Sequence, residues 1–390
     1  MLIVVAVGLA GCAQLNRLSA VPAAGTKQAT IPGIPNARYV LDEARPAELI
    51  AEVKRAYERE VAFQTRIGRV GPLPPANFLA ISGGGDNGAF GAGLLVGWSE
   101  RGTRPQFKAV TGTSTGALTA PFAFLGSQYD AALTDVFTGI DAKDIFEKRP
   151  ILAAVADDAM TDSKPLYAMI AKYVDDDMVA NIAHEYDRGR LLMVATTNLD
   201  AGKPVIWNIG AIAASKDPHS VELIRRVLLA SASIPGVFPP VMFDVELDGQ
   251  RHQEMHGDGG VVAQAFLYPP TIKLASFNPD VRVRARTAYI IRNGKTFDDW
   301  EQVERKTLSI ASRAVSTLIV SNGVNDMYRI YQTTRRDGVG YNLALIDNDF
   351  SEPYKGPFDR DYMNRLFDYA KAKAKAKGGY PWRKTPPGGS

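Results

Sequence analysis

A glycine-rich segment between an apolar run and a helical pattern constrains the fold of this chain more than any other feature. Residues 78–82 (FLAIS) are typical of a short, buried parallel strand. They run into Gly83-Gly84-Gly85-Asp86-Asn87-Gly88, and residues 89–102 continue with apolar side chains at helical spacing. Such a loop presents bare backbone N–H groups at a helix N-terminus, where an anion binds favourably. The segment therefore predicts a strand, an anion-binding loop and a helix.

The same order of strand, glycine-containing loop and helix occurs again in the next segment of the chain. Residues 107–111 (FKAVT) predict a second strand, which ends in Gly112-Thr113-Ser114-Thr115-Gly116 before another helical pattern. G-x-S-x-G between a strand and a helix is the context of a nucleophile elbow, in which a sharp turn exposes the serine hydroxyl. The alternative is an ordinary turn with Ser114 as a helix cap. Two such strands joined by a helix predict a right-handed βαβ unit, and hence an α/β fold with a central, mostly parallel sheet.

The glycine spacing also matches a dinucleotide-binding fingerprint, but the residues that follow do not. That fingerprint calls for an acidic residue about 20 positions on, at the end of the next strand. Here the second strand ends in Gly112, and no Gly-Lys-Ser/Thr phosphate loop is present. A single cysteine excludes a four-cysteine zinc site, and four histidines leave little material for a histidine-rich metal centre. We therefore expect neither a cofactor nor a metal.

A third glycine-rich segment, His256-Gly257-Asp258-Gly259-Gly260, lies far downstream. Asp-Gly is a common turn dipeptide, so Asp258 can be explained as a turn residue. The functional alternative is that the flanking glycines let this carboxylate approach another backbone loop closely.

In order and spacing, these three segments resemble the patatin-like phospholipases. That family carries a G-G-G-x-x-G oxyanion loop, then G-x-S-x-G, and then D-G-G or D-G-A. The matching residues here are Gly83, Gly84, Gly85 and Gly88, then Gly112, Ser114 and Gly116, and then Asp258, Gly259 and Gly260. Residues 229–240 (LASASIPGVFPP) are similar to the family's stretch between nucleophile and aspartate. The resemblance covers about residues 78–270 and implies a three-layer patatin-like fold.

The resemblance also implies a function. It identifies the chain as a lipid acyl hydrolase that uses a Ser114–Asp258 dyad without histidine, an acyl-enzyme, and an oxyanion hole in residues 83–88. The implied substrate is a phospholipid or another acyl-ester lipid. Asn87 stands where family members often have Arg or Lys, a cation that could help hold an anionic headgroup. With an ordinary Asp pKa near 4, activity is expected to persist to low pH, with no loss near the histidine pKa of about 6.5.

Two alternatives are open at this point. An α/β-hydrolase places serine, acid and histidine in that order along the chain, whereas all four histidines here lie between Ser114 and Asp258. Such a triad needs a different acid upstream of His219, His252 or His256, and Asp200 or Asp217 could serve. His256 is explained more simply as a residue that orients the Asp-Gly-Gly turn. The other alternative is a non-catalytic lipoprotein whose glycine loop binds a lipid headgroup.

The N-terminus predicts export and lipidation. Residues 1–11 (MLIVVAVGLAG) are apolar and uncharged, too short to span a bilayer as a helix and typical of the apolar region of a signal peptide. Leu9-Ala10-Gly11-Cys12 resembles the lipobox of bacterial lipoproteins, although no basic residue precedes Arg17. The resemblance implies a signal peptide over 1–11 and an acylated Cys12 that anchors the protein to a membrane surface. Ala13 favours the outer membrane over the inner one within a bacterial cell envelope. The alternative is a frayed apolar end with a buried cysteine.

The expected domain organisation follows from composition. Residues 12–35 are mostly small and polar with several prolines, which predicts a lipidated tether. The hydrolase domain then spans residues 36–370. Residues 371–390 begin with lysines two positions apart, which do not share one face of a helix. This segment is therefore predicted to be a flexible basic tail. The chain has 390 residues, of which 46% are hydrophobic and 22% charged, as in globular proteins. A net charge of +3 does not suggest a nucleic-acid partner.

The remaining patterns predict two strands and two helices. Residues 190–197 and 288–291 are expected to be strands, and residues 46–67 an N-terminal helix. Residues 303–334 predict one long helix, broken near Asn322-Gly323. Its apolar stripe, which includes Leu318, is expected to pack in the core rather than face lipid.

Overall fold

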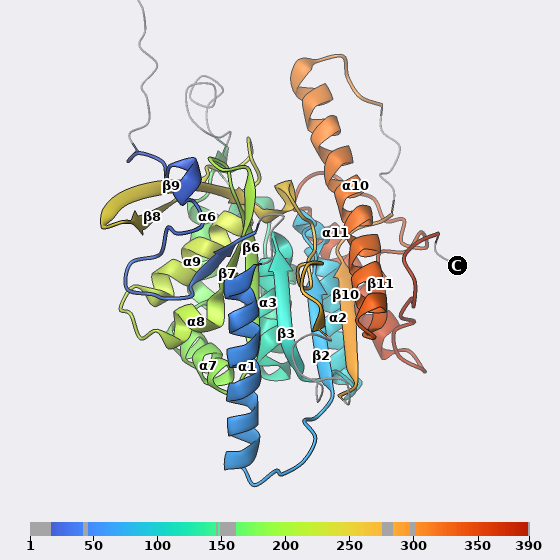
Figure 1. Ribbon diagram of the computed structural model, residues 1–390. Coiled ribbons are helices and arrows are strands. Elements are labelled where there is room, and N and C mark those ends of the chain that lie inside the picture. Colours follow the sequence, from blue (N-terminus) through green and yellow to red (C-terminus); the bar gives the residue numbers. More distant parts are fainter. Residues whose placement is uncertain are drawn as a thin grey trace, which may run out of the picture.

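A mixed sheet of nine strands forms the centre of the protein. The computed structural model describes residues 17–41, 46–145, 147–148, 161–274, 284–296 and 302–388. The main path of the sheet runs β1-β7-β6-β3-β2-β10-β11, and a β8–β9 hairpin joins it at β6 (Figure 1). A separate two-stranded ribbon pairs β4 (Glu147–Lys148) with β5 (Thr161–Asp162). The predicted α/β class is confirmed.

The sheet is parallel from β6 to the edge strand β11, and antiparallel on the other side of β6. The parallel strands are β2 (Ala76–Ile81), β3 (Phe107–Thr113), β6 (Leu191–Asn198), β10 (Arg286–Arg292) and β11 (Gly340–Leu345). The antiparallel strands are β1 (Arg38–Val40), β7 (Lys203–Asn208), β8 (Val241–Leu247) and β9 (Gln250–Asp258). All four strands predicted from apolar runs are therefore present. The other strands of this sheet, β1, β7, β8, β9 and β11, were not predicted.

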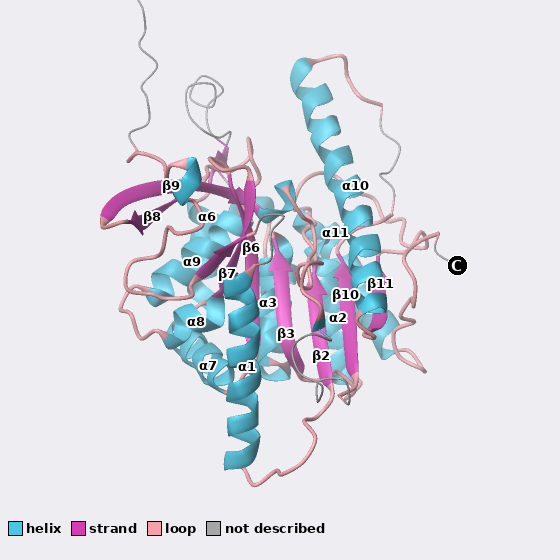
Figure 2. Cartoon of the chain, viewed as in Figure 1, coloured by secondary structure: helices cyan, strands magenta, loops and turns pink. Residues whose placement is uncertain are grey.

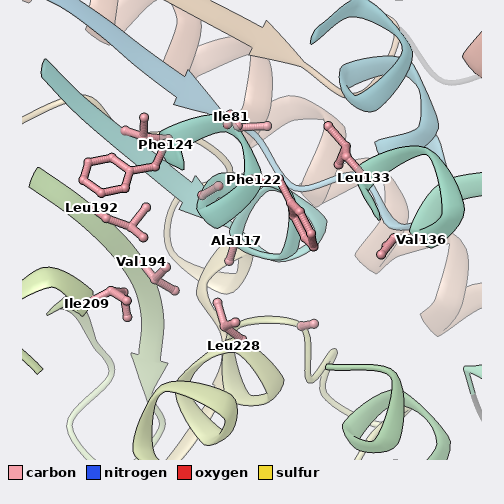
Figure 3. Packing of buried hydrophobic residues seen from close by; sticks show 14 of the residues in the cluster. Ile81, Ala117, Phe122, Phe124, Leu133, Val136, Leu192, Val194, Ile209 and Leu228 are labelled. Atoms are coloured by element: carbon pink, nitrogen blue, oxygen red, sulfur yellow. The ribbon is translucent and has the colours of Figure 1, made fainter. Parts of the chain in front are cut away.

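One face of the sheet carries most of the helices. They are α2 (Gly88–Glu100), α3 (Thr115–Leu125), α4 (Asp130–Thr138), α6 (Lys164–Tyr173), α7 (Asp176–Asp187), α8 (Ile209–Ala214), α9 (Ser220–Ser231) and α11 (Arg360–Lys375). The core of this layer joins β2 and β6 to the helices: Ile81, Leu192 and Val194 lie near Ala117 and Phe124 of α3 (Figure 3). Two helices of this layer start at the predicted site: α2 follows the glycine loop, and α3 follows Ser114.

Helices α1 (Ala47–Arg66) and α10 (Thr307–Arg336) cover the opposite face, on the near side of the sheet in Figures 1 and 2. Side chains of a strand alternate between its two faces, so β2 serves both layers. Leu79 belongs to the core with α2 and α3, whereas Ala80 packs with Met327 and Ile330 of α10. The result is three layers: helices, sheet, helices.

Helix α10 differs from its prediction in two respects. It is continuous through Asn322-Gly323, since an interior glycine weakens a helix by only about 1 kcal/mol and does not by itself end it. At Gly323 the helix passes close to the guanidinium of Arg292, which occupies the space that a side chain would take. Leu318 of the apolar stripe also lies outside the core, since it is 63% exposed.

The N-terminal segment packs against the body where a tether was predicted. From Ala29 to Ala37 its apolar side chains are buried, and Thr30 pairs with Glu246 of β8. Arg38 then forms a buried ion pair with Glu254 of β9. The prediction missed this because single apolar residues among prolines carry no periodic signal. Residues 1–11 and Cys12 lie outside the described residues.

The C-terminal segment is also packed, where a flexible tail was predicted. Helix α11 extends to Lys375, and Lys371 and Lys375 both pair with Glu100 of α2. Beyond it, Tyr380 is buried and Arg383 pairs with Leu343 at the edge strand β11. The alternating lysines thus meet specific carboxylates. No helix among the described residues is both long enough and apolar enough to cross a membrane.

Candidate active site

Strand register brings the three glycine-rich segments to one edge of the sheet. β2 and β3 are adjacent and parallel, so the loop after Ile81 and the turn after Thr113 leave the sheet side by side. Thr113 lies opposite Ala195 of β6, and the next β6 residue, Thr196, lies opposite Asp258 of the antiparallel β9. Ser114 and Asp258, 144 residues apart in sequence, therefore meet beyond the carboxyl ends of β3 and β6.

Ser114 occupies a sharp turn between β3 and α3. Its backbone has φ 54° and ψ −127°, a conformation that is strained by about 1–3 kcal/mol for a residue with a side chain. The turn is tight enough that a Cβ on Gly112 would overlap the carbonyl of Gly116, and one on Gly116 would overlap that of Ile81. The predicted elbow is thus present, and it points the Ser114 hydroxyl away from the strand.

The Ser114 hydroxyl donates a hydrogen bond to Asp258, at 2.6 Å between Oγ and Oδ2. The other carboxylate oxygen accepts the backbone N–H of Gly260 at 2.6 Å. The main chain of Asp258 is held as well: its N–H donates to the Ser233 carbonyl, and its carbonyl accepts the Thr197 hydroxyl. Gly259 passes against Ala195 of β6, where a side chain would clash. The carboxylate is fixed on both sides and aimed at the serine.

Burial shifts the proton affinity of this carboxylate. Asp258 is removed from water, and this desolvation raises its pKa to about 6. The hydrogen bonds from Ser114 and Gly260 act in the opposite direction and favour the charged form. The raised pKa makes Asp258 a stronger base than an exposed aspartate, while it stays mostly ionised at neutral pH.

The glycine loop lies beside the serine. Gly83, at the end of β2, donates its N–H to the Gln264 carbonyl at 3.0 Å, so this amide is already engaged. Gly84 and Gly85 form the mouth of the loop and line the cavity above Ser114, while Gly88 begins α2 against Thr115. Among the described residues no acceptor is found for the Gly84 and Gly85 amides. They are the candidate oxyanion donors, a smaller set than the sequence predicted.

Asn293, which was not predicted as a site residue, holds this loop. Asn293, buried at the end of β10, donates to the Ser82 carbonyl at 2.9 Å and accepts the Gly91 N–H at 3.0 Å. Its carbonyl occupies the space where a Cβ on Gly84 would stand, which explains that glycine. Asn293 therefore positions the loop from a strand more than 200 residues away.

Two further anchors come from other parts of the chain. The Ser231 hydroxyl of α9 accepts the Ser114 N–H at 3.0 Å and donates to the Ala195 carbonyl at 2.7 Å, bracing the elbow. Asn87, where a cation was considered, accepts the hydroxyl of Tyr362 at 2.8 Å. Ser231 lies in the segment that is similar to the family's stretch between nucleophile and aspartate. This similarity was the one sequence feature that pointed to Ser231.

None of the four histidines, all in the described part of the chain, hydrogen-bonds to Ser114. His256 is fully buried and bonds to Thr196 at 2.8 Å and Glu254 at 3.1 Å. Burial lowers the pKa of its ring, which Glu254 opposes. Asp200 binds Arg17, and Asp217 binds the exposed His219. The residues required for a Ser-His-acid triad are not brought together.

The dyad opens into a cavity of about 580 Å³. Arg292 and Lys295 line one side, and Leu318 of α10 lines another. A second, apolar pocket is lined by Ser114 and Gly85 together with Leu118, Phe137 and Phe238. A larger cavity of about 940 Å³ lies between α1 and the sheet, but neither Ser114 nor Asp258 lines it. Among the described residues no group of three metal-ligating side chains is found.

Fold and site together define an α/β protein with a Ser–Asp pair and a glycine-rich loop at the carboxyl edge of its sheet. The model of the patatin-like phospholipase family matches residues 79–269, so this part of the chain is a patatin-like phospholipase domain. Members of the family are lipid acyl hydrolases. A solved structure similar to the chain is VipD from Legionella pneumophila, with 11% sequence identity and a TM-score of 0.36 over 76% of this chain and 67% of that one. No curated protein matches the sequence.

Proposed function

We propose that the chain hydrolyses carboxylic esters of lipids, with Ser114 as nucleophile and Asp258 as general base. The 2.6 Å hydrogen bond between their side chains is the observation that carries the proposal. Ser114 Oγ attacks the ester carbonyl while its proton passes to Asp258 Oδ2. The resulting oxyanion accepts hydrogen bonds from Gly84 and Gly85. Collapse of this intermediate breaks the ester C–O bond, and Asp258 returns the proton to the departing alcohol.

Water completes the cycle. Asp258 takes a proton from a water molecule, whose oxygen attacks the acyl-serine carbonyl. The fatty acid leaves, and Ser114 Oγ recovers a proton. Without a histidine, positioning and oxyanion stabilisation carry much of the rate, and loss of one oxyanion donor is worth about 3–4 kcal/mol in other enzymes. The bracing by Asn293 and Ser231 is consistent with this demand.

The two spaces beside Ser114 differ in chemistry, as the two halves of a phospholipid do. The pocket of Leu118, Phe137 and Phe238 is apolar but measures only about 40 Å³, so it suits the start of an acyl chain next to the ester. The other cavity, lined by Arg292 and Lys295, suits a leaving group with an anionic phosphate. Asn87, where a family cation was considered, lines the same cavity as these two cations, and they support a phospholipid substrate.

Covalent labelling and turnover test the proposal together. We expect a fluorophosphonate probe to modify Ser114, and the protein to hydrolyse a long-chain phospholipid and p-nitrophenyl esters. Mass spectrometry of the labelled peptide locates the adduct, and Ser114→Ala is the control that loses both signals. A folded protein that shows neither labelling nor turnover would favour a lipid-binding module instead.

We also propose that the mature protein is anchored in a bacterial cell envelope, in the outer membrane, by acylation of Cys12. The apolar leader and the lipobox-like Leu9-Ala10-Gly11-Cys12 support this. Two or more acyl chains hold a protein stably at a membrane. In a bacterial host fed an alkyne-labelled fatty acid, we expect the label on the wild type and its loss in Cys12→Ser. Equal labelling of both would refute acylation at this site.

A further inference from the structure

The N-terminal half of α10 extends past the edge of the sheet that carries the active site. Its 30 residues span about 45 Å, whereas the seven residues of the neighbouring β10 span about 23 Å. The helix packs in the core through Val324, Met327 and Ile330, all in its C-terminal half. About 20 Å of helix is therefore left over. Figure 1 shows it projecting beyond the strands. We call residues 307–322 the α10 arm.

The arm has the composition of a surface that meets lipid. From Thr307 to Asn325 the sequence has no acidic residue and a single cation, Arg313, and Arg305 and Lys306 precede it. Ile310 is 54% exposed and Leu318 63%. Solvated helices normally carry charges of both signs on their outer face. Exposed apolar residues on a mildly basic helix instead mark an interfacial segment.

The apolar surface continues to the mouth of the active site. Leu318, Ile319 and Val320 line the cavity above Ser114 and Asp258. Val261 lines the same cavity, and Val261 and Val262, which directly follow Asp258-Gly259-Gly260, are 46% and 37% exposed. Two separate segments of the chain thus present exposed apolar side chains at or next to the cavity, which is a feature of membrane or protein contact sites rather than of an ordinary surface.

We propose that the α10 arm, together with Val261 and Val262, docks onto the surface of a lipid bilayer. This deepens, and rests on, the proposed lipid-ester hydrolysis, because docking would place the cavity mouth where an acyl ester can enter without crossing water. A protein partner seated on the same residues would cover that mouth. Arg313 is the one charged residue in the sequence of the arm, and a lone cation among apolar and uncharged residues is compatible with anionic lipid headgroups.

Vesicle binding tests the proposal without any need for turnover. All proteins carry Cys12→Ala, so that acylation cannot contribute, and vesicles contain equal parts phosphatidylcholine and phosphatidylglycerol. We expect Ile310→Asp combined with Leu318→Asp to reduce co-sedimentation by about tenfold or more, since two apolar contacts become charges. The matched control is Val70→Asp. Val70 is 95% exposed but lies before β2, at the opposite end of the sheet.

A spectroscopic measurement locates the contact directly. Cys12 is the only cysteine, so the Cys12→Ala background allows a single polarity-sensitive dye at Ile310→Cys or, as control, at Val70→Cys. We expect vesicles to shift the emission of the first to shorter wavelength and to leave the second unchanged. Equal responses at both positions, or binding unaffected by the two aspartates, would overturn the proposal. The proposal would also be overturned by a parent protein that does not bind vesicles. It would equally be overturned if the arm mediated a concentration-dependent dimer that does not bind vesicles.

The outcomes separate docking from catalysis. A parent protein that binds vesicles through the arm but is inert toward every ester would refute the proposed hydrolysis and leave the docking surface standing. A parent protein that hydrolyses a soluble p-nitrophenyl ester but binds no vesicles would refute docking alone.

Discussion

Asp258→Asn is expected to lower kcat/KM for ester hydrolysis by about 10⁴-fold or more, with the protein still folded. The amide keeps the shape of the carboxylate, and its oxygen can still accept the Gly260 N–H. It cannot accept the proton of Ser114, so the nucleophile stays neutral. Initial rates on a p-nitrophenyl ester measure the loss, and circular dichroism confirms the fold.

Histidine variants are the matched comparison. His219 is exposed and pairs only with Asp217 among the described residues, so His219→Ala is expected to leave the rate unchanged. His256→Asn is expected to retain turnover in proportion to its folded fraction, because the ring contacts Thr196 and Glu254 rather than Ser114. Turnover that survives Asp258→Asn but vanishes in a histidine variant would restore the triad hypothesis.

The pH profile should differ from the one that the sequence predicted. Asp258 must be ionised to accept a proton, and burial raises its pKa to about 6. The rate should therefore halve near pH 6 and fall tenfold per pH unit below it, rather than persisting to pH 4. A fall in rate near pH 6 resembles the titration of a histidine, so the pH profile should be measured in His256→Asn as well. The same fall in this variant would assign it to Asp258.

The site was predictable where its chemistry is encoded locally. Gly112-x-Ser114-x-Gly116 and Asp258-Gly259 are short patterns whose backbone requirements can be seen in neighbouring residues. Asn293 and Ser231 were not predictable in this way, because each acts on a loop more than 100 residues away through one or two side-chain hydrogen bonds. The pKa of Asp258 also depends on burial, which only the assembled fold determines.

The errors at the two ends of the chain and in α10 have a common cause. Composition alone identifies small, polar or lysine-rich segments as solvated, but a neighbouring carboxylate or an apolar groove can order them. Glu100 does this for Lys371 and Lys375, and the β8 edge does it for Thr30. Gly323 was taken as a helix break, although it marks the close passage of Arg292. In each case a long-range contact outweighed the local tendency.

The second large effect is on stability: Asp258→Asn should raise the free energy of unfolding at pH 8 by about 2–3 kcal/mol. The pKa of Asp258 rises from 3.8 to about 6 on folding, and each unit corresponds to about 1.4 kcal/mol. Since the folded state holds the proton more tightly, the native protein loses stability as pH rises from about 4 to about 6. A neutral amide avoids this loss, and its NH₂ can donate to Ser114 Oγ in place of the bond that the serine made.

The pH dependence makes this prediction specific to the buried charge. Denaturant unfolding of both proteins should give the full difference at pH 8, less at pH 5, and little near pH 4, where the carboxyl is neutral in both states. Asp135→Asn is the control of opposite sign: Tyr173 and Lys172 lower the pKa of that exposed carboxyl, so its loss should change stability by less than about 0.5 kcal/mol and never raise it. An Asp258→Asn protein no more stable than the wild type at pH 8 would mean that the carboxylate is not strained by burial. The dyad would then need another source of basicity, because the same desolvation that destabilises the fold is what makes Asp258 a base strong enough to act on Ser114.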